Sequence, residues 1–366
     1  MIVERCGMQH GISPFTRTPG VAGKALIDTH FSEEIITNFE SPESYKYVYK
    51  IVGLRGSGKS VEYSRVMDHF RQKDEWLVYA LSAGGDPLNT LISMLSRAPF
   101  IEKNQQSVVR RTAGTVGGNI AFFAAQASKE MSINTAENPN YYSAEATLKE
   151  MLAQAKENGF HVLIGIDDIA KSDDMVEFLS IIGTVLMEPD KDVRFVCTGI
   201  AKNIEDFVTV PHLSFFVRNE SIVMKPLDLH AVAAKYRVLL DAGKEDAVRL
   251  AQFTKGYAYA YQVLGEICFK AERTVIDGKI LDSFDDTMAP QYDLIWGTLT
   301  EAEKDLVRII VTGSGSVKEI KEKMEKPSGF ASLRDRLIKK HLLLAEQRGK
   351  VSIPLPRFRE YVDLWQ

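Results

Sequence analysis

The sequence predicts an α/β domain, with a mostly parallel sheet and helices on both faces, followed by a small helical domain and a C-terminal helical piece. Between residues 45 and 199, short runs of β-branched and aromatic residues alternate with segments in which apolar residues recur at helical spacing. This alternation is typical of βαβ units, which build parallel sheets. After about residue 222 the strand signals fade while the helical spacing continues.

The elements follow in order along the chain. Residues 1–44 form an N-terminal segment with one helical stretch. Residues 100–142 interrupt the alternation of strand and helix patterns and are expected to be an insertion. The predicted strands are 45–52, 75–81, 161–167 and 193–199, with amphipathic helices after the first three strands and one at 148–155. The predicted divisions are an N-terminal segment at 1–44, an α/β core at 45–221, a helical domain at 222–289 and a C-terminal domain at 290–366.

The composition is that of an ordinary globular protein, with 366 residues, a net charge of −4 and 45% hydrophobic residues. There is no run of 18 apolar residues and no apolar leader, so neither a membrane span nor a secretory signal is expected. The cysteines, Cys6, Cys197 and Cys268, are widely spaced and form no CxxC pair, which argues against a disulfide framework and a zinc site. We expect a cytoplasmic protein without membrane contact.

Residues 53–60, GLRGSGKS, match the pattern G-x-x-x-x-G-K-[ST] between a predicted strand and a predicted helix. In such a phosphate-binding loop (P-loop), glycines let backbone N–H groups surround phosphate oxygens, and the helix N-terminus adds a positive end. Lys59 is expected to contact the β/γ-phosphates of ATP or ADP, and the Ser60 hydroxyl to ligate Mg²⁺. The predicted nucleotide-binding residues are Gly53, Leu54, Arg55, Gly56, Ser57, Gly58, Lys59, Ser60 and Val61.

A second acidic motif ends the apolar strand at 161–167. Asp167 is expected to hold Mg²⁺, and Asp168 to orient or deprotonate an attacking water as a catalytic carboxylate. The alternative is an acidic turn without function.

Two more residues are candidates for catalysis beside Lys59 and Asp168. Thr198 ends the next strand, where a polar side chain can sense the γ-phosphate or the attacking water, although it can also be a plain strand-end cap. Arg218 lies where the sheet domain gives way to helices, and it is either an arginine finger toward a neighbouring subunit or a solvated surface residue. An arginine finger would require a nucleotide-dependent homo-oligomer.

The C-terminal piece predicts a winged helix-turn-helix, with a helix from Thr300, helices at 316–324 and 330–343, and a hairpin turning at 347–350. Thr300 and Glu303 form a capping box. Such a domain places its third helix in the major groove of duplex DNA. The predicted DNA contacts are Arg334, Arg336, Lys339 and Lys340 on that helix and Arg348 and Lys350 on the wing. Docking to a protein partner is the alternative.

With these motifs in order, the chain resembles the AAA+/STAND division of ATPases, and within it the ATPases related to archaeal origin-recognition initiators. The resemblance rests on GISPFTRTPG, VGLRGSGKS, IGIDDIA, VRFVCTG, MKPLD, TKGYAYAYQVLG and LIKKHLL…GKVSIPLPRFREYV. It spans nearly the whole chain outside 100–142. It implies an α/β P-loop NTPase core, a small α-helical lid domain and a winged helix-turn-helix domain.

The departures from the family pattern concern the nucleotide site. The usual Gly-Arg-Glu is replaced by LIDTHFSEE, so residues 27–29 (Ile27, Asp28 and Thr29) are the expected adenine neighbours. Asp168 stands where hydrolytic members have Glu, Ala258 replaces the usual Pro, and Tyr259 lies near the place of the sensor-2 Arg. Because Asp is one methylene shorter than Glu, it places water less well. The resemblance therefore implies a slow ATPase or switch.

Two functions remain open. The first is an ATP-dependent DNA-associated protein, in which the nucleotide sets the angle between the core and the winged helix. The second is a regulatory switch of a defence or mobile-element system, whose winged helix binds a protein partner or packs on the nucleotide site without contacting DNA. A purely structural P-loop fold is a third option.

Overall fold

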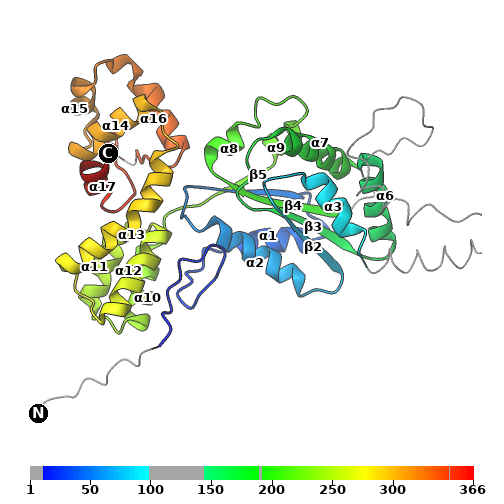
Figure 1. The fold of residues 1–366 in the computed structure, drawn as a ribbon, viewed down its shortest axis with the longest axis horizontal. Coiled ribbons are helices and arrows are strands. Elements are labelled where there is room, and N and C mark those ends of the chain that lie inside the picture. The colour runs from blue at the N-terminus through cyan, green and yellow to red at the C-terminus, as the bar shows by residue number, and fades with distance from the viewer. Residues whose placement is uncertain (1–10, 99–143, 189–191, 346) are drawn as a thin grey trace, which may run out of the picture.

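The computed structural model describes residues 11–98, 144–188, 192–345 and 347–366. The predicted insertion at 100–142 lies outside these residues. Figure 1 shows a sheet flanked by helices on one side of the molecule and two groups of helices on the other, which are linked through the long helix α13, Gly278–Trp296. Within the described residues, no helix is long and apolar enough to cross a membrane.

The sheet confirms the predicted α/β core. Its strands are β1 (Val48–Val52), β2 (Trp76–Leu81), β3 (His161–Ile166), β4 (Val193–Gly199) and β5 (Glu220–Val223). All pairings are parallel, in the order β2-β3-β4-β1-β5. The loops that follow β1, β3 and β4 therefore lie at one edge of the sheet, because parallel strands end on the same side. This edge carries the P-loop and the acidic pair.

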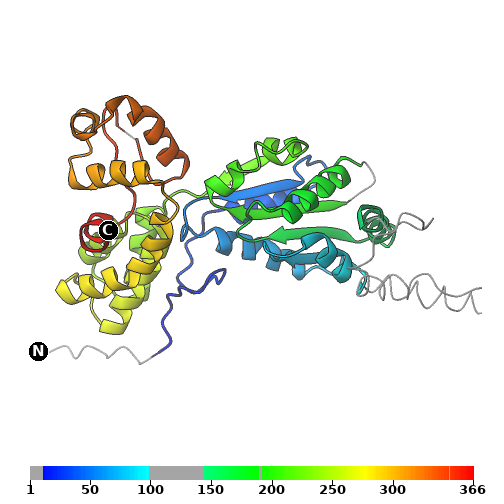
Figure 2. The ribbon, with the colours of Figure 1, turned by 45° about the horizontal axis from the view of Figure 1, so that its top comes forward.

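Helices cover both faces of the sheet (Figure 2). One face packs against α1 (Phe31–Glu40) and α2 (Lys59–Arg71), and the other against α3 (Pro87–Leu95), α6 (Ala144–Glu157) and α7 (Asp173–Met187). Because successive side chains of a strand point to opposite faces of the sheet, neighbouring residues in one strand belong to different hydrophobic cores. In β3, Leu163 joins the α1–α2 core, whereas Ile164 joins the opposite one. Two short helices, α8 (Ala201–Glu205) and α9 (Ser214–Arg218), lead from β4 to β5.

The next group of helices comprises α10 (Leu229–Leu239), α11 (Lys244–Thr254), α12 (Ala258–Ala271) and α13. The N-terminal segment is anchored on this group before it reaches the sheet domain (Figure 1). The Phe15 ring packs 5.9 and 5.7 Å from the rings of Tyr236 and Tyr261 and rests against Gly265, where a Cβ atom would lie 2.3 Å from it. Residues 11–30 therefore join the helical group to the sheet domain.

The C-terminal group contains α14 (Glu301–Thr312), α15 (Val317–Lys323), α16 (Phe330–Lys339) and α17 (Phe358–Trp365), with a 3-10 turn at Pro327–Gly329. A short hairpin follows α16, with an antiparallel bridge at Leu344–Ser352, and a second bridge, Ser316–Lys350, joins it to the start of α15. Three helices and a hairpin thus appear in the predicted order. The predicted limit at residue 290 lies inside α13, and one hydrophobic core runs through both helical groups.

Candidate nucleotide-binding site

The P-loop lies between β1 and α2. Gly58, the N-cap of α2, has φ 98°, and Gly56 has φ 77°, so both occupy the left-handed region that favours glycine. A cavity of about 430 Å³ opens in front of the loop, and the stretch from Arg55 to Val61 lines it. The sequence also placed Gly53 and Leu54 among the nucleotide-binding residues, but these two do not line this cavity within the described part of the chain.

Lys59 is buried at the base of the loop, where it is 7% exposed. Its ammonium donates hydrogen bonds to the carbonyl oxygens of Gly53 (3.2 Å) and Leu54 (2.9 Å). Burial lowers the pKa of Lys59 to about 8, because a desolvated ammonium is less stable than its neutral form. An anion in the cavity would raise this pKa again, because it stabilises the charged ammonium.

The acidic motif meets the P-loop at the predicted edge. The Ser60 hydroxyl lies 3.2 Å from Asp167 Oδ1, so the two predicted metal ligands are side by side. The Arg55 guanidinium lies 3.4 Å from Asp168 Oδ2, and both side chains are partly exposed. Asp168 has φ 56°, an uncommon backbone conformation for a residue with a side chain. The catalytic candidate is thus held at a strained position beside the loop.

Thr198 has a role that the sequence did not indicate. Its buried hydroxyl donates to Asp167 Oδ1 (2.5 Å) and accepts from the backbone N–H of Asp168 (2.8 Å). The one proton of this hydroxyl is therefore committed to Asp167. Thr198 therefore fixes both acidic residues, and its expected role as a γ-phosphate sensor stays a prediction.

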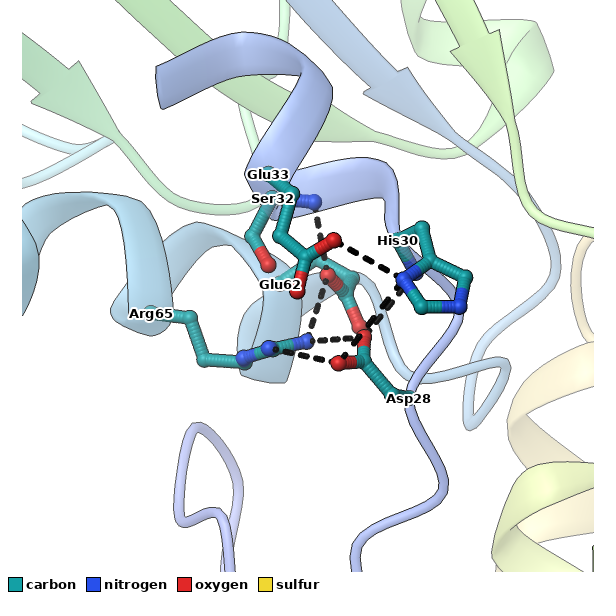
Figure 3. Close-up of polar contacts among 6 residues, drawn as sticks. All are labelled: Asp28, His30, Ser32, Glu33, Glu62 and Arg65. Atoms are coloured by element: carbon teal, nitrogen blue, oxygen red, sulfur yellow. Dashed lines mark hydrogen bonds and ion pairs between the residues drawn. The ribbon is translucent and has the colours of Figure 1, made fainter. Parts of the chain in front are cut away.

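The N-terminal segment, which carries the expected adenine neighbours, forms one wall of the cavity. Ile27 and Thr29 line the cavity, and the buried Thr29 hydroxyl has no hydrogen-bond partner within the described residues. Asp28, the third expected adenine neighbour, does not line the cavity, because it points to Arg65 of α2, with 2.9 Å between Arg65 Nη1 and Asp28 Oδ1 (Figure 3). This hydrogen bond lowers the pKa of Asp28 to about 2.

A buried carboxylate of α2 completes this anchor. Glu62 is 2% exposed and accepts hydrogen bonds from the backbone N–H of Ser32 (3.0 Å) and from Arg65 (3.4 Å), as Figure 3 shows. The helix that starts in the P-loop therefore also holds the start of α1. This connection fixes the N-terminal wall of the cavity relative to the phosphate loop.

The opposite wall belongs to α12 and α13. Ala258, Tyr259 and Gln291 line the cavity. The Tyr257 hydroxyl donates to the Arg55 carbonyl oxygen (2.5 Å), and Gln291 reaches the same hydroxyl (3.3 Å). The helical group therefore contacts the backbone of the P-loop directly.

The C-terminal group also approaches the P-loop. A second cavity, of about 400 Å³, is lined by Leu54 of the loop, the segment after β5, His341 and Leu355. Burial lowers the pKa of His341, and the nearby Lys59 charge acts in the same direction. Lys339 at the end of α16 lies 3.6 Å from Glu205 of α8.

The basic residues predicted to contact DNA do not share one free surface. The Lys340 ammonium is part-buried and bonds to the Thr298 carbonyl oxygen (3.0 Å) and to Glu303 (2.7 Å), a carboxylate that is 1% exposed. Lys340, predicted as a DNA contact, is therefore engaged inside the protein, where it serves the capping box of α14. Arg334 pairs with the adjacent Asp335, while four others are exposed: Arg336, Lys339, Arg348 and Lys350.

Arg218, the arginine-finger candidate, ends α9 beside the edge strand β5. Its side chain is exposed, and it does not line the nucleotide cavity of its own chain within the described residues. A role toward a neighbouring subunit stays a prediction.

Comparison with known proteins supports the fold. A family model described as a domain of unknown function (DUF8462) matches residues 291–362. The Walker-type ATPase PABY2304 of Pyrococcus abyssi is similar over 96% of this chain and 99% of that chain, with 15% identity and a TM-score of 0.64. The ORC2 protein of Aeropyrum pernix, in its ADPNP–ADP complexes, is similar over 97% and 96%, with 13% identity and a TM-score of 0.50. No curated protein matches the chain.

These similarities confirm the predicted resemblance at the level of fold. The chain has the fold of the Walker-type ATPase PABY2304 and of the archaeal ORC2 protein.

Proposed function

We propose that this chain binds ATP or ADP with Mg²⁺ in the 430 Å³ cavity and acts as a slow ATPase or nucleotide-dependent switch. The observation that carries the proposal is the convergence of Lys59, Ser60, Asp167 and Asp168 on one cavity at the carboxyl edge of the sheet. The similar ORC2 protein of Aeropyrum pernix binds ADPNP and ADP, which supports an adenine nucleotide as the ligand.

The residues at this edge suit magnesium. The Ser60 hydroxyl and the Asp167 carboxylate present oxygen atoms 3.2 Å apart, and oxygen is the donor that Mg²⁺ prefers. Bound Mg²⁺ would neutralise phosphate charge. Thr198 holds the Asp167 carboxylate in place for this purpose.

Slow turnover follows from the position of Asp168. Its Oδ2 lies 3.4 Å from the Arg55 guanidinium, which competes with a water molecule for this oxygen. The side chain is also a methylene shorter than the Glu of hydrolytic relatives, so that it reaches less far toward the phosphate. A long-lived nucleotide complex suits a switch better than a motor.

The part that is switched is proposed to be the C-terminal group, as a winged helix-turn-helix domain packed beside the nucleotide site. The contact between Lys339 and Glu205 and the second cavity behind the P-loop support this arrangement. They favour a regulatory switch. Control of DNA binding is the second candidate, which the exposed Arg336, Arg348 and Lys350 support.

Nucleotide binding is tested by titration calorimetry with ADP and Mg²⁺. Wild type should bind, Lys59→Ala should lose at least tenfold in affinity, and Lys279→Ala, an exposed lysine on α13, should match wild type. Equal affinity of wild type and Lys59→Ala would refute the site. Steady-state hydrolysis by Asp168→Asn then separates slow turnover from binding alone.

The role of the C-terminal group is tested by gel shifts on duplex DNA, with and without ATP, at two salt concentrations. The DNA function would be established if the chain bound DNA in a salt-sensitive manner and if Arg336→Glu and Arg348→Glu abolished this binding. Absence of binding in every nucleotide state would leave the regulatory switch. Size-exclusion chromatography with ATP tests the homo-oligomer that a role for Arg218 requires.

A further inference from the structure

A short segment between α11 and α12, Lys255–Tyr259, touches two distant parts of the chain. On one side it contacts the P-loop, where the Tyr257 hydroxyl donates to the Arg55 carbonyl oxygen at 2.5 Å. The backbone N–H of Tyr259 donates to the Gly56 carbonyl oxygen at 2.9 Å. Two consecutive carbonyl groups of the P-loop are thus held by one segment, which we call the bridge segment.

On its other side, the bridge segment holds the C-terminal hairpin. The Lys255 ammonium donates to the carbonyl oxygens of Ile353 (3.1 Å) and Leu355 (3.0 Å). Its backbone has φ 51°, and burial lowers its pKa. This side chain is therefore committed to the hairpin backbone, where a displacement would leave a part-buried charge with fewer partners.

The P-loop fits closely against the bridge segment. A Cβ atom on Gly56 would lie 2.5 Å from the Tyr257 hydroxyl oxygen and 2.8 Å from Tyr259 Cβ. The hydroxyl of the buried Tyr257 also receives a hydrogen bond from Gln291 of α13 (3.3 Å). The loop can therefore not shift toward α12 without moving this segment as well.

We propose that Tyr257 is a positioning residue for the P-loop, and that the bridge segment couples the nucleotide site to the C-terminal hairpin. The proposal rests on the nucleotide site described above. Because a peptide group is planar, holding the Arg55 carbonyl oxygen also fixes the direction of the Gly56 N–H, one of the groups that a P-loop aims at phosphates. A nucleotide that turns this peptide pulls on Tyr257, and through it on Lys255 and the hairpin.

The 400 Å³ cavity gives this movement room. It lies among the P-loop, the bridge segment and the hairpin, and Leu54, Tyr257 and Leu355 all line it. In a close-packed interior a displacement of this kind would meet side chains at once. Here the segment can move into open space while Lys255 keeps its two bonds.

The test uses Tyr257→Phe, which removes only the hydroxyl, with Tyr236→Phe as the matched control. The Tyr236 hydroxyl is also buried and donates to a backbone carbonyl, that of Tyr261 (2.8 Å), but it has no contact with the P-loop. We expect ADP to bind about five- to tenfold more weakly to Tyr257→Phe, the effect of one lost hydrogen bond, and to Tyr236→Phe as it does to wild type. Unchanged affinity in Tyr257→Phe would overturn its positioning role.

Coupling is measured by hydrogen exchange without nucleotide. Lys255→Met keeps the aliphatic chain but loses both bonds to the hairpin, and it should raise amide exchange in the P-loop as well as in residues 344–355 by at least threefold. Faster exchange confined to the hairpin would overturn the coupling. If wild type bound no ADP while Lys255→Met still loosened the P-loop, the nucleotide proposal would fail and the coupling would stand.

Discussion

The clearest test of how Asp167 and Asp168 are positioned is Thr198→Val, which replaces a hydroxyl by a methyl group of similar size. In the structure this hydroxyl donates to Asp167 at 2.5 Å and accepts from the Asp168 N–H at 2.8 Å. The substitution removes a hydrogen bond to a carboxylate and leaves a backbone N–H without its partner. It also allows the backbone of Asp168, which is strained at φ 56°, to relax.

The magnitude follows from these two losses. A hydrogen bond to a charged group contributes about 1.5–3 kcal/mol, and leaving the part-buried Asp168 N–H unpaired costs about 1–3 kcal/mol if water does not replace the partner. Relaxation of the strained Asp168 backbone offsets about 1 kcal/mol of this. We therefore expect Thr198→Val to lower the free energy of unfolding by about 1.5–5 kcal/mol.

Urea denaturation without nucleotide measures this change. Thr198→Ser keeps the hydroxyl and should remain within about 1 kcal/mol of wild type, and Thr184→Val, which removes a hydroxyl from the surface of α7, should cost less than about 1 kcal/mol. The reasoning would be refuted if Thr198→Val were as stable as wild type, or if Thr198→Ser lost as much as Thr198→Val. The Mg²⁺ dependence of ADP affinity should weaken in Thr198→Val alone.

Two further predictions concern ion pairs. Lys340→Met leaves the buried Glu303 carboxylate without its ammonium, so the free energy of unfolding should fall by about 3–5 kcal/mol in urea denaturation. Asp28 has a folded-state pKa of about 2, below its ordinary 3.8, so its contribution to stability is complete above about pH 4 and is lost as the pH falls toward 2. Arg65→Met should flatten this acid dependence in denaturation curves recorded at several pH values.

Each of these predictions has a control. Lys304→Met removes a pair between side chains that are 20% and 79% exposed, and it should cost less than about 1 kcal/mol. A loss in Lys340→Met no larger than this would contradict the buried-charge argument. Asp28→Asn should reduce the acid dependence between pH 4 and 2 by the part that Asp28 contributes, and an unchanged slope in Arg65→Met would show that Arg65 does not set the pKa of Asp28.

Local patterns in the sequence were sufficient to predict the α/β core and the end of the sheet at which the candidate site lies. The strand at 193–199 was predicted with the bounds that the structure has, and the P-loop and the Asp167–Asp168 pair follow β1 and β3 as expected. These features are local, since strand alternation and glycine spacing are written in consecutive residues. Parallel strands then bring their carboxyl ends together. Strand β5 was missed because its four residues lie at a sheet edge and three of them are exposed.

The sequence by itself thus determined the α/β core, the phosphate loop and its acidic partners. Only the tertiary structure decided what Thr198, Lys340 and Tyr257 do. Tyr257 meets the Arg55 carbonyl across 202 positions, and Lys340 meets Glu303 across 37. The physical reason is that a hydrogen bond between distant segments depends on how whole elements pack. The identity of a tyrosine or lysine does not show whether its polar group is solvated or bonded to a buried partner.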